Sequence, residues 1–231
     1  MEAQTYSSAG LKKELLVTRD GSHTVVIPSL DISYRSRHGA VQESTHVFIN
    51  AGLHYQWAQQ PHTDLTIFEV GFGTGLNALL TCNEAAKAKR KVYYTTIEPD
   101  PLDSSMTSSL NFSDEQSYLS QMHNVPWGKQ IAIHPYFVFT KYMSTLDQYH
   151  TTDASYDVVF YDAFSPLMQP GLWTSSSFEK ILLMMNKAAV LTTYCSKSEV
   201  RRTMMKVGLQ VHKIPGPYGK REMVRAVKAI N

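Results

Sequence analysis

The chain changes its pattern of hydrophobic and polar residues near residue 61. Before that point, short β-type runs at 14–18 and 24–28 flank the pair Asp20-Gly21, and an Asp-Gly pair between two such runs is a strong hairpin signal. Apolar residues then recur at helical spacing over 43–59. We predict that residues 1–61 form a small N-terminal β-hairpin and helix extension.

After residue 61, apolar runs alternate with helical patterns. Strands are predicted at 65–70, 91–97, 156–161, 188–194, 210–214 and 222–229. Helices are predicted at 76–87, 100–109, 114–123, 172–185 and 198–207. Such alternation predicts an α/β domain with a mostly parallel, doubly wound sheet, and the short connection between the last two strands requires an antiparallel hairpin. This architecture, over residues 62–231, is typical of class I, Rossmann-like S-adenosylmethionine methyltransferases.

A glycine-rich loop follows the first strand of that domain. Gly71, Gly73 and Gly75 alternate with other residues, Glu69 precedes them and Asn77 follows. Glycine permits positive φ and close approach of a ligand to the backbone, and the following helix offers free N–H groups. The Gly-x-Gly-x-Gly spacing differs from the Gly-x-Gly-x-x-Gly of dinucleotide sites. It favours S-adenosylmethionine over NAD, with a turn that binds no ligand as the alternative.

Acidic residues end two of the predicted strands. Glu98 follows the second strand, where a carboxylate can accept both ribose hydroxyls of a nucleoside cofactor; the alternative is an acid at a helix start. Asp162 follows the strand predicted at 156–161, where it can orient or deprotonate an amine; the alternative is a cap for the next segment. Phe164 can wall the reaction pocket or stack on a base.

Composition and charge limit the class of protein. Hydrophobic residues make up 43% of the 231 and charged residues 18%, which indicates a globular core. No run reaches the roughly 20 apolar residues that span a bilayer, and the two cysteines form no Cys-x-x-Cys pair. The histidines lack metal-like spacing. We expect a cytoplasmic protein without a membrane segment or a metal.

Five segments of the chain are characteristic when they occur together in this order. They are Tyr34-x-Ser36-x-His38-Gly39 with Gln42-Glu43-Ser44, Glu69-Val70-Gly71-Phe72-Gly73-Thr74-Gly75-Leu76-Asn77, Asp162-Ala163-Phe164-Ser165-Pro166, Thr193-Tyr194 with Val200-Arg201-Arg202, and Gly219-Lys220-Arg221-Glu222-Met223. Over roughly residues 30 to 229, the chain resembles the methyltransferase domain of the MnmC type, the tRNA 5-methylaminomethyl-2-thiouridine-forming enzyme.

The resemblance implies methylation of the exocyclic amine of 5-aminomethyl-2-thiouridine at the tRNA wobble position. It implies a catalytic Asp162 and a cofactor site at the glycine loop and Glu98. Bifunctional relatives add a flavin-dependent oxidase domain after the methyltransferase. Because the chain ends at Asn231, we expect a stand-alone methyltransferase without flavin, and any oxidase partner would act upstream as a separate protein. The Gly-Asp pair expected after the third strand is missing, and the matching stretch is 137–141.

The basic residues are concentrated near the C-terminus. Residues 197–231 contain nine Lys and Arg against two Glu, although the whole chain carries only +2. Four of them are candidates to bind tRNA phosphates: Arg201, Arg202, Lys220 and Arg221. The alternative is a solvated helix face and a hairpin turn. From the N-terminal side, Tyr34, Ser36 and Glu43 are expected to line the substrate pocket, with a helix start as the alternative for Glu43.

Two other functions stay open. One is a small-molecule methyltransferase or an aminopropyl transferase on the same fold. A basic C-terminal block argues against a free polyamine substrate, because like charges repel. The other is a non-catalytic binding module that keeps the fold, against which the intact glycine loop and Asp162 argue together.

Overall fold

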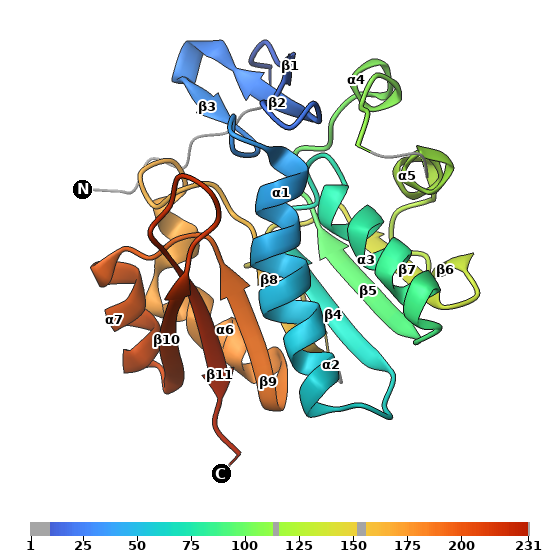
Figure 1. The fold of residues 1–231 in the computed structure, drawn as a ribbon. Coiled ribbons are helices and arrows are strands. Elements are labelled where there is room, and N and C mark those ends of the chain that lie inside the picture. Colours follow the sequence, from blue (N-terminus) through green and yellow to red (C-terminus); the bar gives the residue numbers. More distant parts are fainter. Residues whose placement is uncertain (1–9, 113–115, 152–155, 231) are drawn as a thin grey trace.

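The computed structural model describes residues 10–112, 116–151 and 156–230. Its main sheet has eight strands in the order β10-β11-β9-β8-β4-β5-β7-β6 (Figure 1). The parallel strands are β4 (Leu65–Val70), β5 (Val92–Ile97), β7 (Phe137–Tyr142), β8 (Tyr156–Tyr161) and β9 (Met185–Thr193). The strands that pair antiparallel with their neighbours are β6 (Ile131–His134), β10 (Leu209–Pro215) and β11 (Glu222–Lys228). The predicted fold class is confirmed, including the final hairpin.

Both faces of this sheet are covered. Along β8, Val158 and Phe160 join a core with the long helix described below, while Val159 and Tyr161 join a second core that includes Phe178. Successive residues of a strand point to opposite faces, so the apolar run at 158–161 in β8 indicates burial on both sides. The helices after β4 are α3 (Leu76–Ala88), α4 (Ser104–Ser108), α5 (Gln116–Asn124), α6 (Ser175–Met184) and α7 (Ser198–Lys206).

Two predicted helices begin later than expected. Asp103 accepts a hydrogen bond from the backbone N–H of Met106 at 2.8 Å and caps α4, so the helix predicted from residue 100 starts after Pro101 and this cap. Likewise, α6 starts after the cap Thr174 and follows a 3-10 turn, η3 (Pro170–Trp173). The first two residues of the helix predicted at 114–123 lie outside the described residues.

The predicted helix over 43–59 is one continuous helix with an irregular middle. It consists of α1 (Ala40–Ser44), the π-helical segment η2 (Thr45–His54) and α2 (Tyr55–Gln59). It packs on the sheet beside α3, against β8 and β9 (Figure 1). At Gly52, an added Cβ would lie 2.9 Å from Phe160, so the missing side chain lets the helix approach the sheet closely.

A small antiparallel sheet lies across the ends of β4 and β5 (Figure 1). It contains β1 (Glu14–Val17), β2 (His23–Ile27) and β3 (Ile32–Ser33), with a 3-10 turn η1 (Pro28–Leu30) between the last two. The hairpin predicted at Asp20-Gly21 is present, with Gly21 at φ +82°. Lys13 pairs with Asp100 at 2.9 Å and joins this sheet to the main one. The division of the chain at residue 61 stays a prediction.

Strands β6 and β7 were not predicted, and the expected position of the Gly-Asp pair was wrong for this reason. The stretch 137–141, compared above with a Gly-Asp pair after the third strand, is itself strand β7. The residues that follow this strand are Met143 to Asp147. The Gly-Asp pair was therefore looked for within the strand and not after it. An acid, Asp147, is present in the loop that follows the strand.

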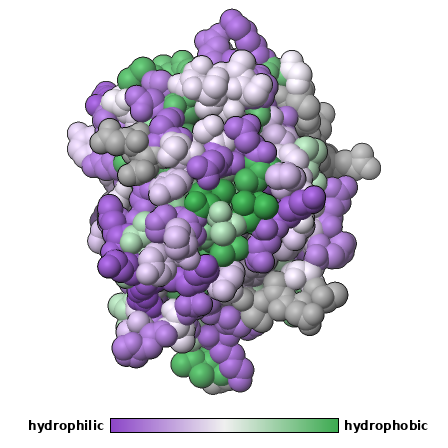
Figure 2. Space-filling view, turned by 90° about the vertical axis from the view of Figure 1, so that its right-hand side faces the viewer, coloured by the Kyte–Doolittle hydropathy of each residue, from purple (hydrophilic) through white to green (hydrophobic). Residues whose placement is uncertain are grey.

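The outer surface on the side of α5 and β6 is largely hydrophilic, with one hydrophobic area near its middle (Figure 2). Among the residues that the structure describes, none of the helices has the length and apolar character to cross a membrane.

Candidate active site

A cavity lies at the carboxyl ends of β4, β5 and β8. Its volume is about 410 Å³, within the roughly 300–1,000 Å³ of small-molecule sites. The lining contains Gly71, Gly73, Glu98, Asp162 and Phe164. In open α/β sheets, ligands bind outside these strand ends. The glycine loop and Asp162, the acid after β8, therefore open onto the same cavity.

The backbone of the glycine loop touches the end of β8. Gly71 has φ +93°, and an added Cβ would lie 3.1 Å from the carbonyl oxygen of Asp162. The N–H of Asp162 in turn donates to the carbonyl of Val70 at 3.1 Å. Gly75, at φ +77°, is the N-cap of α3. Its absent side chain leaves room for Phe72, whose ring would lie 2.9 Å from an added Cβ.

Glu98 is held at the cavity wall by two backbone groups. Its oxygens accept the N–H of Gly73 and the N–H of Asp100, each at 2.9 Å. Burial raises the pKa of Glu98 to about 7. Each carboxylate oxygen has a second lone pair, so the group can still accept hydrogen bonds from a ligand in the cavity.

Asp162 forms a buried ion pair with Arg35, a residue that the sequence analysis missed. The exposed fractions of the two side chains are 6% and 4%. Asn77 donates to Asp162 Oδ2 at 2.9 Å. Burial raises the pKa of Asp162 to about 6, and the Arg35 guanidinium opposes that rise. Arg35 lies between Tyr34 and Ser36, both of which were predicted, and this position in the sequence was the available signal.

Glu69 lies under the glycine loop and not in the cavity lining. It is fully buried, and Asn77 donates to its Oε1 at 2.9 Å while also donating to Asp162. Burial raises the pKa of Glu69 to about 8, so the carboxyl is mostly protonated at neutral pH. The Asn77 side chain therefore links Glu69 to Asp162 and holds the Asp162 carboxylate in place. The role of Asn77 and Glu69 in binding a cofactor stays a prediction.

Aromatic residues close the cavity on the side of the small sheet. The rings of Tyr34 and Phe164 meet edge to face, with centroids 5.0 Å apart. The loop that carries Phe164 is fixed by Gln169, which accepts its N–H at 2.8 Å, and by Trp173, which donates to its carbonyl at 2.8 Å. Tyr34 and Phe164 are thus brought together with Asp162, as predicted for a substrate pocket.

The six other predicted substrate residues lie outside the cavity lining. Ser36 donates its backbone N–H to Glu43 Oε2 at 2.8 Å, and Lys220 lies 2.6 Å from Glu43 Oε1. Arg201 donates to the carbonyl of Ser196 at 3.1 Å. The side chains of Glu43 and Lys220 therefore bind each other, and Arg201 binds the loop before its own helix. The remaining two, Arg202 and Arg221, are exposed.

The loop after β7 forms another wall. Ser144, Thr145, Leu146 and Asp147 all line the cavity. They follow Tyr142, whose carbonyl accepts the N–H of Glu98 at 3.0 Å. This wall was not predicted, because the strand before it, β7, was overlooked.

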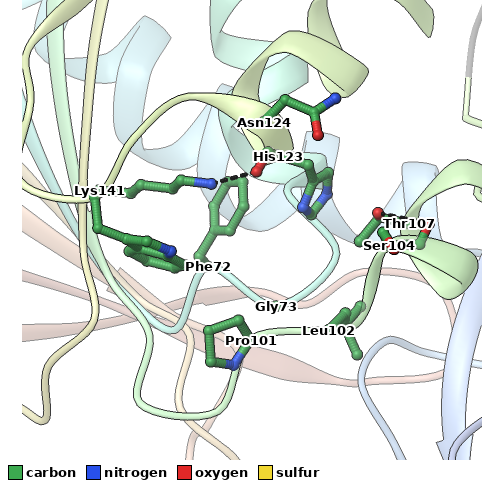
Figure 3. A pocket seen from close by; sticks show the side chains of 10 residues that line it. Phe72, Gly73, Pro101, Leu102, Ser104, Thr107, His123, Asn124 and Lys141 are labelled. Atoms are coloured by element: carbon green, nitrogen blue, oxygen red, sulfur yellow. Dashed lines mark hydrogen bonds between the residues drawn. The ribbon is translucent and has the colours of Figure 1, made fainter.

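A second cavity of about 190 Å³ lies behind the glycine loop and shares Gly73 with the first (Figure 3). Lys141 donates to the carbonyl of His123, in the last turn of α5 (Figure 3). Its ammonium also lies 4.4 Å from the centre of the Trp127 ring. A cation at a helix C-terminus is stabilised there, so Lys141 fastens α5 to the sheet.

The chain is similar to known methyltransferases. Residues 136–229 match the sequence model of a family described as S-adenosyl-L-methionine-dependent methyltransferase. The chain is 29% identical over 212 residues to the tRNA 5-methylaminomethyl-2-thiouridine biosynthesis bifunctional protein MnmC of Marinomonas sp.. That match covers 84% of this chain and 31% of the relative, so the chain spans about a third of the length of the curated relatives it matches. The resemblance to MnmC-type methyltransferase domains is confirmed.

Solved structures support the fold. MnmC2 from Aquifex aeolicus superposes with a TM-score of 0.81 at 21% identity, covering 98% of this chain and 73% of that one. Human methyltransferase-like protein 13 in complex with SAH gives a TM-score of 0.50 at 13% identity, covering 81% and 82%. At these identities the likeness concerns the fold.

Proposed function

We propose that this chain transfers a methyl group from S-adenosylmethionine to the exocyclic amine of 5-aminomethyl-2-thiouridine at the wobble position of tRNA. The observation that carries the proposal is the single cavity that joins the glycine loop, Glu98 and the Arg35–Asp162 pair. The MnmC relatives are named for the biosynthesis of this nucleoside.

The residues present fit S-adenosylmethionine. Gly71 and Gly73 expose backbone at the cavity, and Glu98 has acceptor capacity left for ribose hydroxyls. Thr74 also lines the cavity, and its buried hydroxyl has no hydrogen-bond partner within the described part of the chain. An unpaired buried hydroxyl costs free energy, which a polar cofactor group would relieve. The walls at Glu98 and at 144–147 are the candidate sites for the nucleoside end.

When bound, S-adenosylmethionine supplies an activated methyl group on a sulfonium. The residues of the chain have to align the acceptor amine and remove its proton, because an ammonium has no lone pair to attack with. Above pH 6 the Asp162 carboxylate is mostly ionised, so it attracts the ammonium and accepts one of its protons. Arg35 maintains that charge, and Tyr34 with Phe164 excludes water from the reacting atoms.

Exposed Arg202 and Arg221, with Arg201 and Lys220 nearby in sequence, are proposed to contact tRNA phosphates. Such contacts provide affinity without reading sequence, and they weaken as salt increases.

The test uses purified protein, S-adenosylmethionine and tRNA from cells that lack the modification. Mass spectrometry of the digested wobble nucleosides should show 5-aminomethyl-2-thiouridine gaining one methyl group. Fully methylated tRNA and free amines, including a polyamine, serve as controls. Labelling of a free amine with no gain in tRNA would refute the proposal in favour of a small-molecule transferase.

A further inference from the structure

Charges of alternating sign connect the β10–β11 turn with Asp162. Lys220 pairs with Glu43 at 2.6 Å. The other oxygen of Glu43 accepts the backbone N–H of Ser36 at 2.8 Å. The preceding residue, Arg35, pairs with Asp162. The Glu43 side chain is only 8% exposed, so solvent and salt screen its charge weakly.

The same turn reaches the active-site loop by a second route. Lys220 Nζ lies 4.3 Å from the centre of the Tyr194 ring. The Tyr194 hydroxyl donates to the carbonyl of Ala163 at 2.9 Å. Ala163 follows Asp162 directly, so Lys220 contacts a tyrosine that holds the backbone next to Asp162. Lys220 lies 177 residues from Glu43 in the sequence.

We propose that Glu43 and Lys220 are positioning residues that set the charge balance of the Arg35–Asp162 pair. A guanidinium beside two carboxylates stabilises each of them less than it would stabilise one alone. The positive charge of Lys220 offsets the negative charge of Glu43. Arg35 therefore stabilises the Asp162 carboxylate more fully. The catalytic consequence rests on the proposed function, whereas the charge coupling does not.

The groups around Asp162 agree with this arrangement. Burial raises the pKa of Asp162, Arg35 lowers it and Glu43 raises it. The other titratable groups that face this cluster are Glu69 on β4, Tyr94 on β5, and Tyr194 and Cys195 after β9. They are the same in every variant used below, so a difference between variants reports on Glu43 and Lys220.

The two residues are expected to act in opposite directions. Glu43→Gln removes the competing carboxylate, so the pKa of Asp162 should fall. Lys220→Met leaves Glu43 without its partner, so the pKa of Asp162 should rise. Each shift should reach about half a unit, below the roughly 1–3 units produced by a charge in direct contact. Lys220→Arg keeps the charge and should restore the value of the unsubstituted protein.

The experiment measures the titration of the Asp162 carboxyl by 13C NMR in the full chain, assigned by the loss of its signal in Asp162→Asn. Lys213→Met is the matched control, because Lys213 pairs with Glu222 at 2.7 Å in the same hairpin and lies outside the charge chain. Opposite shifts in Glu43→Gln and Lys220→Met, with none in the control, support the proposal. Shifts in the same direction, or none beyond error, overturn it.

Methyl transfer supplies the functional readout. The acid limb of the pH–rate profile should move with the NMR pKa, to lower pH in Glu43→Gln and to higher pH in Lys220→Met. If the unsubstituted protein transfers no methyl group to tRNA, the proposed function fails, while the NMR titration still decides the charge coupling.

Discussion

Replacing Arg35 by methionine should destabilise the protein strongly and in a pH-dependent way. The Arg35 and Asp162 side chains are 4% and 6% exposed, so the substitution leaves a carboxylate buried without its counter-charge. Breaking one partner of a buried pair costs about 3–5 kcal/mol of folding free energy. We expect a loss of that size in urea unfolding at pH 8.

The pH dependence has a definite sign. Burial raises the pKa of Asp162 above its ordinary 3.8 even beside Arg35, and without Arg35 it rises further. A carboxyl whose pKa is higher in the folded state lowers stability as pH rises through that pKa. The loss caused by Arg35→Met should therefore shrink between pH 8 and pH 5, where the carboxyl of the variant is protonated.

Two further variants decide whether the buried charge is the cause. Adding Asp162→Asn to Arg35→Met removes the unpaired charge and should recover much of the lost stability. Arg37→Met, whose partner Asp31 is 91% exposed, should cost less than about 1 kcal/mol. An Arg35→Met loss that is equal at both pH values, or that the second substitution does not reduce, would refute the reasoning.

Two other predictions concern the cofactor and the loop. Affinity for S-adenosylmethionine in isothermal titration calorimetry should increase as pH rises through about 7, the pKa of Glu98, because the carboxylate accepts ribose hydroxyls. Glu98→Gln should lower the affinity roughly tenfold or more, since hydrogen bonds to charged groups contribute about 1.5–3 kcal/mol, and should abolish the pH dependence; an unchanged Kd would contradict this role. Gly75→Ala should lower the free energy of unfolding by more than about 1 kcal/mol, because φ is +77° and the new Cβ would lie 2.9 Å from Phe72. Gly208→Ala, with φ +100° and open space around it, measures the cost of backbone strain alone. An equal loss of stability in both variants would show that the contact with Phe72 contributes nothing.

The sequence predicted those parts of the site that depend on local pattern. A strand that runs into alternate glycines, and acids at the ends of two buried strands, place Gly71, Glu98 and Asp162 at one edge of a parallel sheet. The structure has all three in one cavity lining. This follows because the carboxyl ends of parallel strands meet at the same edge whatever the loops do.

The rest of the site depends on contacts between distant segments. Arg35 reaches Asp162 from a loop of the small sheet, and no periodic pattern marks which residue of that loop points inward. The sequence shows only that position 220 carries a positive charge, which fits a phosphate contact as well as an ion pair with Glu43. The strand β7 was overlooked because most of its residues are buried, and such a short run cannot be told from a buried helix segment by periodicity alone.

The central claim is that methyl donor and acceptor amine meet in the cavity between the glycine loop and Asp162. It is tested most directly by single-turnover methyl transfer to undermethylated tRNA with Asp162→Asn, alongside calorimetric binding of S-adenosylmethionine. We predict a fall in transfer rate of about 10²–10⁴-fold, the usual contribution of a general base, with cofactor affinity nearly unchanged. A variant that binds S-adenosylmethionine and transfers methyl groups at the unsubstituted rate would contradict the claim.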